Sequence, residues 1–368
     1  MAEKMKIGIV GLGNISPAYI KGCRAFKNLE LVACADLLPE RAAKIADENA
    51  IPRALSVDEL LADNEIDIVV NLTIPAVHAA VSQDILSAGK HVYSEKPLAI
   101  TLEDARAVLN VAESRGLRVG CAPDTFLFAP HQTSRKLIDD GAIGTPVAAV
   151  GFMAGHGPES WHPNPDFFYT EGGGPMLDMG PYYVTCLVNL LGPVLRVSGA
   201  ARASFPERIA GDGHRIPVSI PTHYAGTLEF ASGAIATLIT SFDVWGHRLP
   251  QMEVYGETGS LAVPDPNGHS PREVLMISSQ SREWEKMPLS YPDIWARGIG
   301  LADMADAIQH NRPHRASGAL AYHVLEVMSS FVLASQTGTY INIASKIEQP
   351  AAISVDIPPV FITADAKA

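Results

Sequence analysis

The first third of the chain alternates short apolar segments with amphipathic ones, and this alternation constrains the fold more than any other feature. It predicts strands at 6–11, 29–36, 67–73, 91–95 and 117–122, and helices at 16–26, 38–49, 75–89 and 102–116. Such alternation gives right-handed crossovers between parallel strands. Nearly continuous apolar strands such as DIVVNLT (67–73) are typical of sheets covered on both faces. We therefore predict a doubly wound α/β domain over residues 1–125.

The pattern changes after about residue 145, where the strand-like segments lengthen and follow one another more closely. They occupy 146–155, 194–205, 224–244, 251–263 and 273–279. Ser232-Gly233 and the segment GETGSL (256–261) each interrupt an apolar run, which indicates hairpin turns. Successive hairpins predict an antiparallel or mixed sheet with helices on one face. We assign this sheet to a second, α+β domain over residues 126–368.

Composition and charge exclude several function classes. The chain has 368 residues, which is long for one core and sufficient for two domains. Its formal net charge of -12 argues against a nucleic-acid or anionic-membrane partner, because neutralising phosphates requires clustered Lys and Arg. We find neither a signal peptide nor an uninterrupted apolar stretch long enough to span a membrane, so we expect a cytoplasmic protein. The four cysteines form no CxxC pair, and we expect them to be reduced, buried thiols.

The segment GLGNIS (11–16) follows the first expected strand and opens the first expected helix. It carries two glycines of a dinucleotide-binding fingerprint, with Ser16 where Gly or Ala is usual. The first glycine permits a tight turn and the second lets the backbone approach a pyrophosphate. Free N–H groups at the helix N-terminus then bind the phosphates. The predicted cofactor contacts here are Gly11, Gly13, Asn14 and Ile15.

Asp36 ends the second expected strand, 25 residues after Gly11. This is close to the acidic position that binds a ribose 2′-hydroxyl in dinucleotide-binding domains. A carboxylate there would repel a 2′-phosphate, and Leu37 follows it rather than an arginine. The sequence therefore predicts NAD rather than NADP as the cofactor. The alternative is that Asp36 only caps the next helix.

The third and fourth expected strands end in TIP (73–75) and SEKP (94–97), on the same rim of the sheet. Ligands of open α/β sheets bind beyond the carboxyl ends of the strands. The rim therefore adds seven predicted cofactor contacts: Thr73, Ile74, Pro75, His78, Glu95, Lys96 and Pro97. For His78, a purely structural role is an equal alternative.

These motifs, together with EGGGPMLDMGPYY (171–183), resemble the Gfo/Idh/MocA family of NAD(P)-dependent oxidoreductases, which includes sugar and polyol dehydrogenases. The resemblance covers essentially the whole chain, and EKP is its most specific element. It implies a Rossmann domain followed by a domain built on a large, mostly antiparallel open sheet. The exposed face of that sheet often mediates oligomerisation, so we expect a homodimer or homotetramer. The resemblance also implies that Lys96 contacts both the nicotinamide ribose and the substrate.

The chain departs from the family pattern at Tyr182. Asp178 and Tyr182 are spaced i,i+4 on one face of an expected helix. The family usually has histidine at the second position and gives it the proton-transfer role. The reference pKa of tyrosine, about 10, makes it a poor base at neutral pH unless a nearby ammonium such as Lys96 lowers that pKa. Two functional hypotheses stay open: Tyr182 exchanges the proton with Lys96, or it only binds substrate and Lys96 carries the proton alone. The structural alternative is that Tyr182 is a core residue.

The expected substrate site adds residues from two loops. Trp161 and His162 lie in a loop where they could stack on a polyol and bind its hydroxyls. Asp124 follows the fifth strand, where many family members carry Arg or Asn, and this argues mildly against an anionic substrate. The predicted substrate contacts are Lys96, Asp124, Trp161, His162, Asp178 and Tyr182.

We therefore predict hydride transfer between NAD and a secondary alcohol or hemiacetal carbon of a sugar or polyol. The predicted catalytic residues are Lys96, Tyr182 and Asp178. No metal is expected, because the histidine groups at 156–162 and 310–314 lack a matched set of ligands. Three alternatives remain: NAD(P)H-dependent reduction of a keto-sugar or aldehyde, a non-catalytic nucleotide-binding regulatory protein, and a lyase that uses bound NAD transiently.

Overall fold

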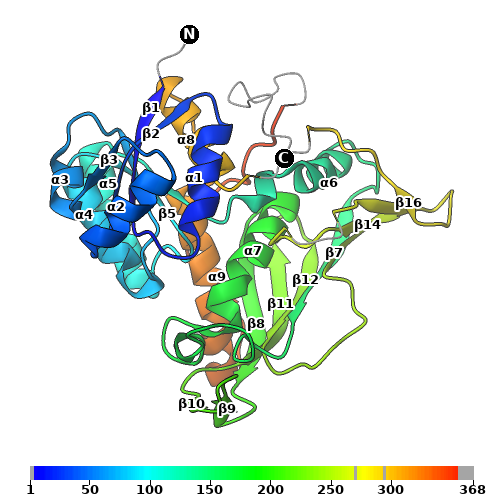
Figure 1. The fold of residues 1–368 in the computed structure, drawn as a ribbon. Coiled ribbons are helices and arrows are strands. Elements are labelled where there is room, and N and C mark those ends of the chain that lie inside the picture. The colour runs from blue at the N-terminus through cyan, green and yellow to red at the C-terminus, as the bar shows by residue number, and fades with distance from the viewer. Residues whose placement is uncertain (1–3, 269–271, 293–295, 355–368) are drawn as a thin grey trace. The chain divides into compact units, whose positions relative to one another are not determined.

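The chain folds into two compact units (Figure 1). The computed structural model describes residues 4–268, 272–292 and 296–354. The first unit contains residues up to 128 together with 292–322 and 353–354, and the second contains residues 129–291 and 323–352. The predicted boundary at residue 125 lies close to the observed one. However, residues 292–322, which we assign to the second domain from sequence, belong to the first unit.

The first unit is built on a parallel six-stranded sheet with the order β3-β2-β1-β4-β5-β6. Its strands are β1 (Met5–Val10), β2 (Leu29–Ala35), β3 (Arg53–Leu55), β4 (Ile68–Asn71), β5 (His91–Ser94) and β6 (Val119–Cys121). Every residue of β4 is buried, as its continuous apolar sequence predicts. The doubly wound parallel sheet is confirmed, with β3 as an additional three-residue edge strand.

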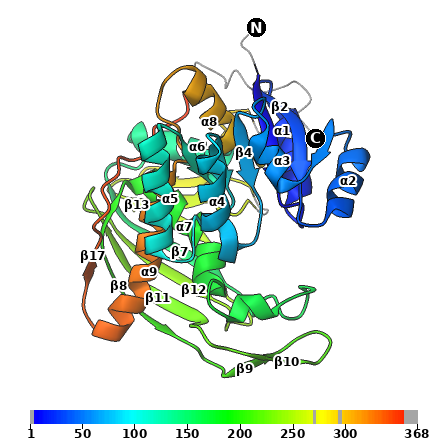
Figure 2. The same cartoon turned by 90° about the vertical axis from the view of Figure 1, so that its left-hand side faces the viewer.

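The expected helices of the first unit are confirmed within one to three residues. They are α1 (Ser16–Ala25), α2 (Pro39–Glu48), α4 (His78–Ser87, after the 3-10 turn η1, Pro75–Val77) and α5 (Leu102–Arg115). The hydroxyl of Thr101 accepts a hydrogen bond from the Asp104 N–H and so caps α5, which ends at Gly116 in the left-handed conformation. The short helix α3 (Val57–Ala62) was not expected. Figure 2 shows α4 and α5 packed side by side.

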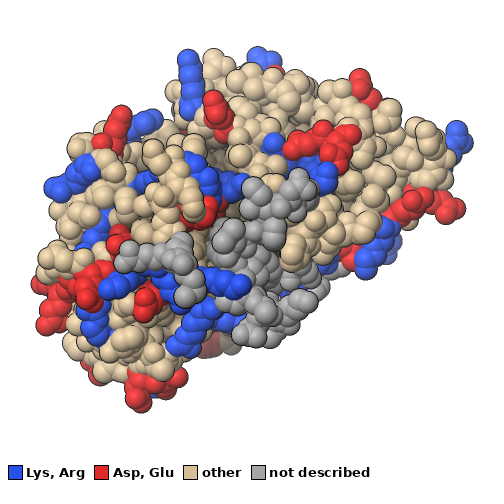
Figure 3. Space-filling model, turned by 90° about the horizontal axis from the view of Figure 1, so that it is seen from above, with Lys and Arg blue, Asp and Glu red and all other residues tan. Residues whose placement is uncertain are grey.

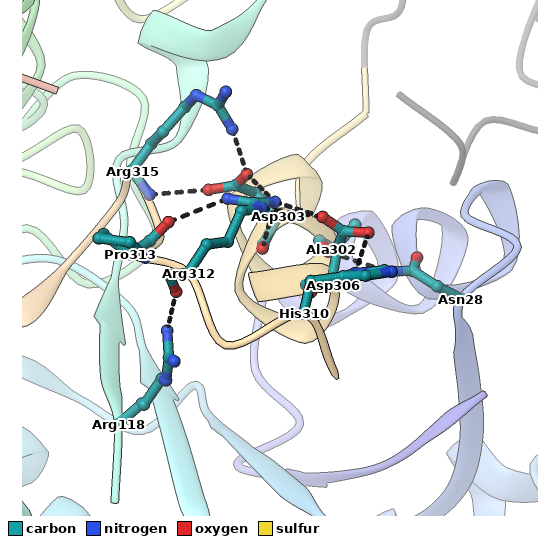
Figure 4. Close-up of polar contacts among 9 residues, drawn as sticks. All are labelled: Asn28, Arg118, Ala302, Asp303, Asp306, His310, Arg312, Pro313 and Arg315. Carbon is teal, nitrogen blue, oxygen red and sulfur yellow. Dashed lines mark hydrogen bonds and ion pairs between the residues drawn. The ribbon is translucent and has the colours of Figure 1, made fainter. Parts of the chain in front are cut away.

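A cluster of ion pairs holds the returning segment together (Figure 4). The segment contains α8 (Ile299–Gln309) and the start of α9 (Gly318–Thr337). The nearly fully buried carboxylate of Asp303 on α8 pairs with the guanidinium groups of Arg312 and Arg315. Arg118, which directly precedes β6, donates a hydrogen bond to the Arg312 carbonyl oxygen. The contact between Arg118 and Arg312 joins residues 194 positions apart, which explains why strand periodicity alone did not place this segment in the first unit.

The second unit is built on a nine-stranded sheet with the order β16-β15-β14-β13-β7-β12-β11-β8-β17. Its strands are β7 (Pro146–Ala154), β8 (Val194–Arg202), β11 (His223–Phe230), β12 (Ile235–Ser241), β13 (Met252–Gly256), β14 (Gly259–Val263), β15 (Leu275–Ser278), β16 (Glu285–Lys286) and β17 (Ile341–Asn342). Among the described strands, β7 and β12 pair in parallel and the other neighbouring pairs of this sheet are antiparallel. The mixed, mostly antiparallel sheet and both hairpins are confirmed.

The helix α7 (Gly174–Leu191) packs on β7, β11 and β12. A Cβ atom at Gly151 of β7 would lie 3.4 Å from the ring of Tyr183, so the absence of a side chain there lets the helix lie close to the sheet. The other elements of this unit are α6 (Ala129–Asp139), the 3-10 turn η3 (Asp166–Tyr169) and the small hairpin β9 (Glu207–Ile209) and β10 (Arg215–Pro217). The 3-10 turn η2 (Thr125–Leu127) ends the first unit's main segment.

Three further properties bear on the expected environment of the protein. The helix α9 is long and apolar enough to cross a membrane, but 61% of its most apolar window is buried, and core helices pass the same test. All four cysteines are buried free thiols, as predicted. On the face shown in Figure 3, basic and acidic side chains are interspersed among uncharged ones.

Candidate active site

The order of the first sheet reverses between β1 and β4, and ligands bind at such a switch point in open α/β sheets. Gly11 follows β1 with a φ of +90°, and a Cβ atom there would lie 2.8 Å from the backbone carbonyl of Leu72. Gly13 differs, because a Cβ atom there would meet no heavy atom within 4 Å. The first glycine is therefore required by the packing of the protein itself. The second leaves open space at the start of α1, which fits the approach of a pyrophosphate.

Asp36 directly follows β2, and its buried carboxylate organises the glycine loop. One oxygen accepts a hydrogen bond from the Leu12 N–H at 2.8 Å, and the other accepts one from the Leu38 N–H at 3.0 Å. Arg41 lies 3.6 Å from the first oxygen. The N-cap residue of α2 is Leu38, so Asp36 is not that cap. The position beside the glycine loop fits a ribose-binding carboxylate.

His78 joins the ends of β4 and β5. Its Nδ1 lies 2.7 Å from the carbonyl oxygen of Pro97, and its Nε2 lies 2.9 Å from that of Thr73. The imidazole is buried, and burial lowers its pKa. Because both ring nitrogens face backbone oxygens, the structural role is the one the geometry supports for His78. It fixes the two strand ends relative to each other.

The other predicted cofactor residues divide by accessibility. Gly13, Asn14 and Ile74 are exposed, and Ile15, Thr73, Pro75 and Lys96 are half-buried. Glu95 and Pro97 are buried, so their contribution is to hold neighbouring groups. The accessible set is formed by the glycine loop and the ends of β4 and β5.

Glu95 fixes the backbone of Lys96. Its buried carboxylate accepts one hydrogen bond from the Tyr19 hydroxyl at 2.8 Å and another from the Lys96 N–H at 3.0 Å. Burial raises the pKa of Tyr19, which keeps the phenol protonated as a donor. Lys96 is thus held by its own main chain, and its side chain is half-buried at the carboxyl end of β5. The sequence offered no signal for Tyr19, because it occupies an ordinary apolar position of α1.

Replacing Tyr19 with phenylalanine should lower the free energy of unfolding by about 1–3 kcal/mol, because one donor to a buried carboxylate is lost. The matched control is Tyr93→Phe, since the buried Tyr93 hydroxyl makes no hydrogen bond to any described residue. The control should be nearly neutral or slightly stabilising. Urea unfolding of both variants measures the difference, and equal losses would contradict this role of Tyr19.

Asp124, the residue before η2, is fully buried and contacts the start of α8. One carboxylate oxygen accepts hydrogen bonds from the N–H groups of Gly298 at 2.7 Å and Gly300 at 3.1 Å. These donors belong to the first turn of a helix, where N–H groups have no partner within the helix. Burial raises the pKa of the Asp124 carboxyl. The structure therefore gives Asp124 a structural role where the sequence predicts a substrate contact.

In the second unit, Asp178 and Tyr182 lie one turn apart on α7, which confirms that they share a helix face. Asp178 is half-buried and Tyr182 is buried. Gly174, the first residue of α7, has a φ of +85°, a conformation that favours glycine. Lys96 belongs to the first unit, so its cooperation with Tyr182 stays a prediction.

Trp161 and His162 lie in the long loop between β7 and α7. Trp161 is exposed and His162 is half-buried. Their ring centroids are 5.6 Å apart in a T-shaped arrangement, and the Asn164 N–H donates to the His162 Nδ1 at 3.1 Å. The loop is therefore structured, and Trp161 is accessible to a ligand.

The histidine groups do not form a metal centre in the part of the chain that the structure describes. No cluster of three or more His, Cys, Asp or Glu side chains there could hold a metal ion. Glu159 instead pairs with the buried guanidinium of Arg208 at 3.2 Å. His310, which directly follows α8, lies 3.1 Å from the carboxylate of Asp306 in that helix.

Known protein families match the sequences of both units. Residues 5–122 match an oxidoreductase family with an NAD-binding Rossmann fold, and residues 131–262 match the GFO/IDH/MocA C-terminal domain. The chain belongs to the Gfo/Idh/MocA family. Its first unit is therefore an NAD-binding domain and the protein is an oxidoreductase. The open space at Gly13 and the carboxylate of Asp36 fit this cofactor.

Family members are similar to this chain over most of its length. The 1,5-anhydro-D-fructose reductase of Ensifer adhaerens is 29% identical over 337 residues, which cover 90% of this chain and 96% of that protein. The D-xylose dehydrogenase of Paenarthrobacter nicotinovorans is 24% identical over 254 residues, covering 63% and 66% of the two chains.

Solved structures of other oxidoreductases share the fold. An NAD-binding oxidoreductase from Klebsiella pneumoniae superimposes with a TM-score of 0.82 at 20% identity, over 93% of this chain and 100% of that one. Levoglucosan dehydrogenase in complex with NADH and L-sorbose superimposes with a TM-score of 0.80 at 20% identity, over 93% of this chain and 99% of that one.

Proposed function

We propose that this oxidoreductase transfers a hydride between NAD and a secondary alcohol or hemiacetal carbon of an uncharged sugar or polyol. The observation that carries the proposal is the half-buried Lys96, fixed through Glu95 at the carboxyl end of β5. This end belongs to the rim of the sheet that also carries the glycine loop. Similarity to a sugar reductase and a sugar dehydrogenase supports a carbohydrate substrate.

The residues of the proposed site would have separate roles in the reaction. NAD, when bound, supplies the carbon that accepts or donates the hydride. Lys96 orients the reacting hydroxyl and stabilises negative charge that develops on its oxygen. Tyr182 exchanges the proton of that hydroxyl, and Asp178 accepts a hydrogen bond from the substrate. His78 and Glu95 hold the loops that present Lys96 and do not touch the substrate.

The reverse direction is a second candidate function. The relative of Ensifer adhaerens, similar over 90% of this chain, is named a reductase. The same residues would then donate a proton to the carbonyl oxygen of a keto-sugar as the hydride arrives at its carbon. Lys96 and Tyr182 serve both directions because a group that accepts a proton in one direction returns it in the other.

A substrate screen tests the proposal. Uncharged aldoses, polyols and lactones would be incubated with NAD or NADH, and the absorbance of the reduced nicotinamide followed. We expect turnover with at least one uncharged sugar or its keto form. Turnover only with anionic substrates, or with none of these compounds, would overturn the proposal. Size-exclusion chromatography of the same preparation tests the predicted homodimer or homotetramer.

The variant Tyr182→Phe separates the two hypotheses for this residue. If Tyr182 exchanges the proton, removing its hydroxyl should lower kcat by roughly 10²- to 10⁴-fold with a small change in KM. If it only binds substrate, KM should rise while kcat is kept. We expect the first result. The neighbouring Tyr183→Phe is the control on the same helix: it removes a hydroxyl that contacts the buried Asp265 carboxylate at 3.5 Å, so it should lower stability while kcat is kept.

A further inference from the structure

Trp245 is both highly exposed and held in place. Its side chain is 83% exposed, and it follows β12 in a short loop. One face of its indole stacks on the imidazole of His156, with ring centroids 3.4 Å apart and an angle of 13° between the planes. The opposite face of the indole is therefore the exposed one. A large apolar surface of this kind costs free energy in water unless a ligand covers it.

A buried guanidinium contacts the imidazole of the stacked pair. The Nη1 of Arg208 lies 3.4 Å from the Nε2 of His156. Arg208 is 5% exposed, and it is fixed by Glu159, by Asp243 and by the carbonyl oxygen of Phe242 at 2.7 Å. Because these partners hold Arg208 from several sides, its contact with His156 restrains the imidazole on which the indole stacks. The indole is thus preorganised for binding, which lowers the entropic cost of covering it.

Within the second unit, the pair lies at the end of the sheet where α7 begins. β7 and β12 are parallel neighbours, and the loops that carry His156 and Trp245 follow their carboxyl ends. The Val244 N–H donates to the Gly155 carbonyl oxygen at 3.0 Å, which joins the two loops. The hydroxyl of Thr240, near the end of β12, contacts the sulfur of Met176 in the first turn of α7. Asp178 lies two residues further along the same helix.

We propose that the exposed indole face of Trp245 binds the C–H face of a pyranose ring, as a carbohydrate-stacking subsite of the second unit. This inference rests on the proposed sugar substrate. A glucose-type ring with equatorial hydroxyls presents C–H groups on its faces, and these carry partial positive charge that the negative face of an aromatic ring attracts. The exposed Trp161, in the loop after β7, is a second aromatic side chain for the same ligand class.

The test compares Trp245→Ala and Trp245→Phe with the control Trp284→Ala. Trp284 is 44% exposed in the same unit, but it precedes β16, at the edge of the sheet and four strands away from β7. Binding of methyl β-D-glucopyranoside and of cellobiose would be measured by calorimetry without NAD. Loss of the stacking ring should weaken binding roughly threefold to tenfold. The phenylalanine variant should keep part of the affinity, and the control all of it.

Three outcomes would overturn the inference: unchanged sugar binding in Trp245→Ala, no sugar binding by the unmodified protein, or a fall in oligomeric mass of Trp245→Ala. The last would mark Trp245 as a contact between copies of the chain. Sugar turnover with unchanged binding in Trp245→Ala would leave the proposed function intact and remove only the subsite. Sugar binding that depends on Trp245 without any turnover would support the subsite and remove the proposed function.

Discussion

Replacing Lys96 with alanine is expected to lower kcat by roughly 10²- to 10⁴-fold while the affinity for NAD changes only a few-fold. The proposal places the ammonium at the reacting hydroxyl, so its loss removes the charge that would stabilise negative charge developing on the oxygen. The backbone of Lys96, by contrast, is held by Glu95 through its main-chain N–H, which alanine keeps. The variant should therefore fold normally and still bind the cofactor.

The measurement is steady-state kinetics with the sugar found in the screen, alongside calorimetric titration with NAD. Lys44→Ala is the matched control, because Lys44 is an exposed residue of α2 in the same unit and its ion-pair partner among the described residues is Glu48, one turn away. We expect this control to keep normal kcat. Near-normal kcat in Lys96→Ala would end the catalytic role proposed for it, and the proton transfer would then have to depend on the residues of α7.

The elements that the sequence predicted are those whose signal is local. β1 and β4 are apolar runs, and the hairpin between β11 and β12 has Ser232-Gly233 at its turn. Gly11 and Gly13 were also visible, because a glycine pair between a strand and a helix, with Asp36 at the end of the next strand, matches a dinucleotide-binding fingerprint. Local periodicity and turn chemistry were sufficient for these features.

The features that the sequence did not predict depend on contacts between distant segments. The short strands β3 and β17 are too brief to show a period of two. The roles of Tyr19 and Asp124 follow from partners 76 and 174 residues away. Asp124 was interpreted as a substrate contact because it follows a strand. Its carboxylate instead accepts hydrogen bonds from backbone N–H groups at the N-terminus of α8. The return of residues 292–322 to the first unit depends on packing of the same kind.

Replacing Gly11 with alanine should have the second large effect, and it should act before any cofactor binds. The backbone φ of +90° is unfavourable for a residue with a side chain, and the new Cβ would lie 2.8 Å from main-chain atoms of Leu72. Since backbone atoms of a buried strand end cannot move aside as a flexible side chain can, we expect a loss of about 2–4 kcal/mol in the free energy of unfolding. Thermal unfolding of the cofactor-free protein measures this loss.

Gly13→Ala is the matched variant that separates folding from cofactor binding. The new methyl group would meet no protein atom within 4 Å, so the melting temperature of the cofactor-free protein should be nearly unchanged. The methyl group would instead occupy the space through which the backbone approaches the pyrophosphate, so the Kd for NAD should rise about tenfold or more. Calorimetric titration with NAD measures that change. If Gly13→Ala bound NAD normally, the pyrophosphate would have to lie elsewhere on the rim. A melting temperature for Gly11→Ala equal to that of the unmodified protein would mean that the loop can relax away from β4.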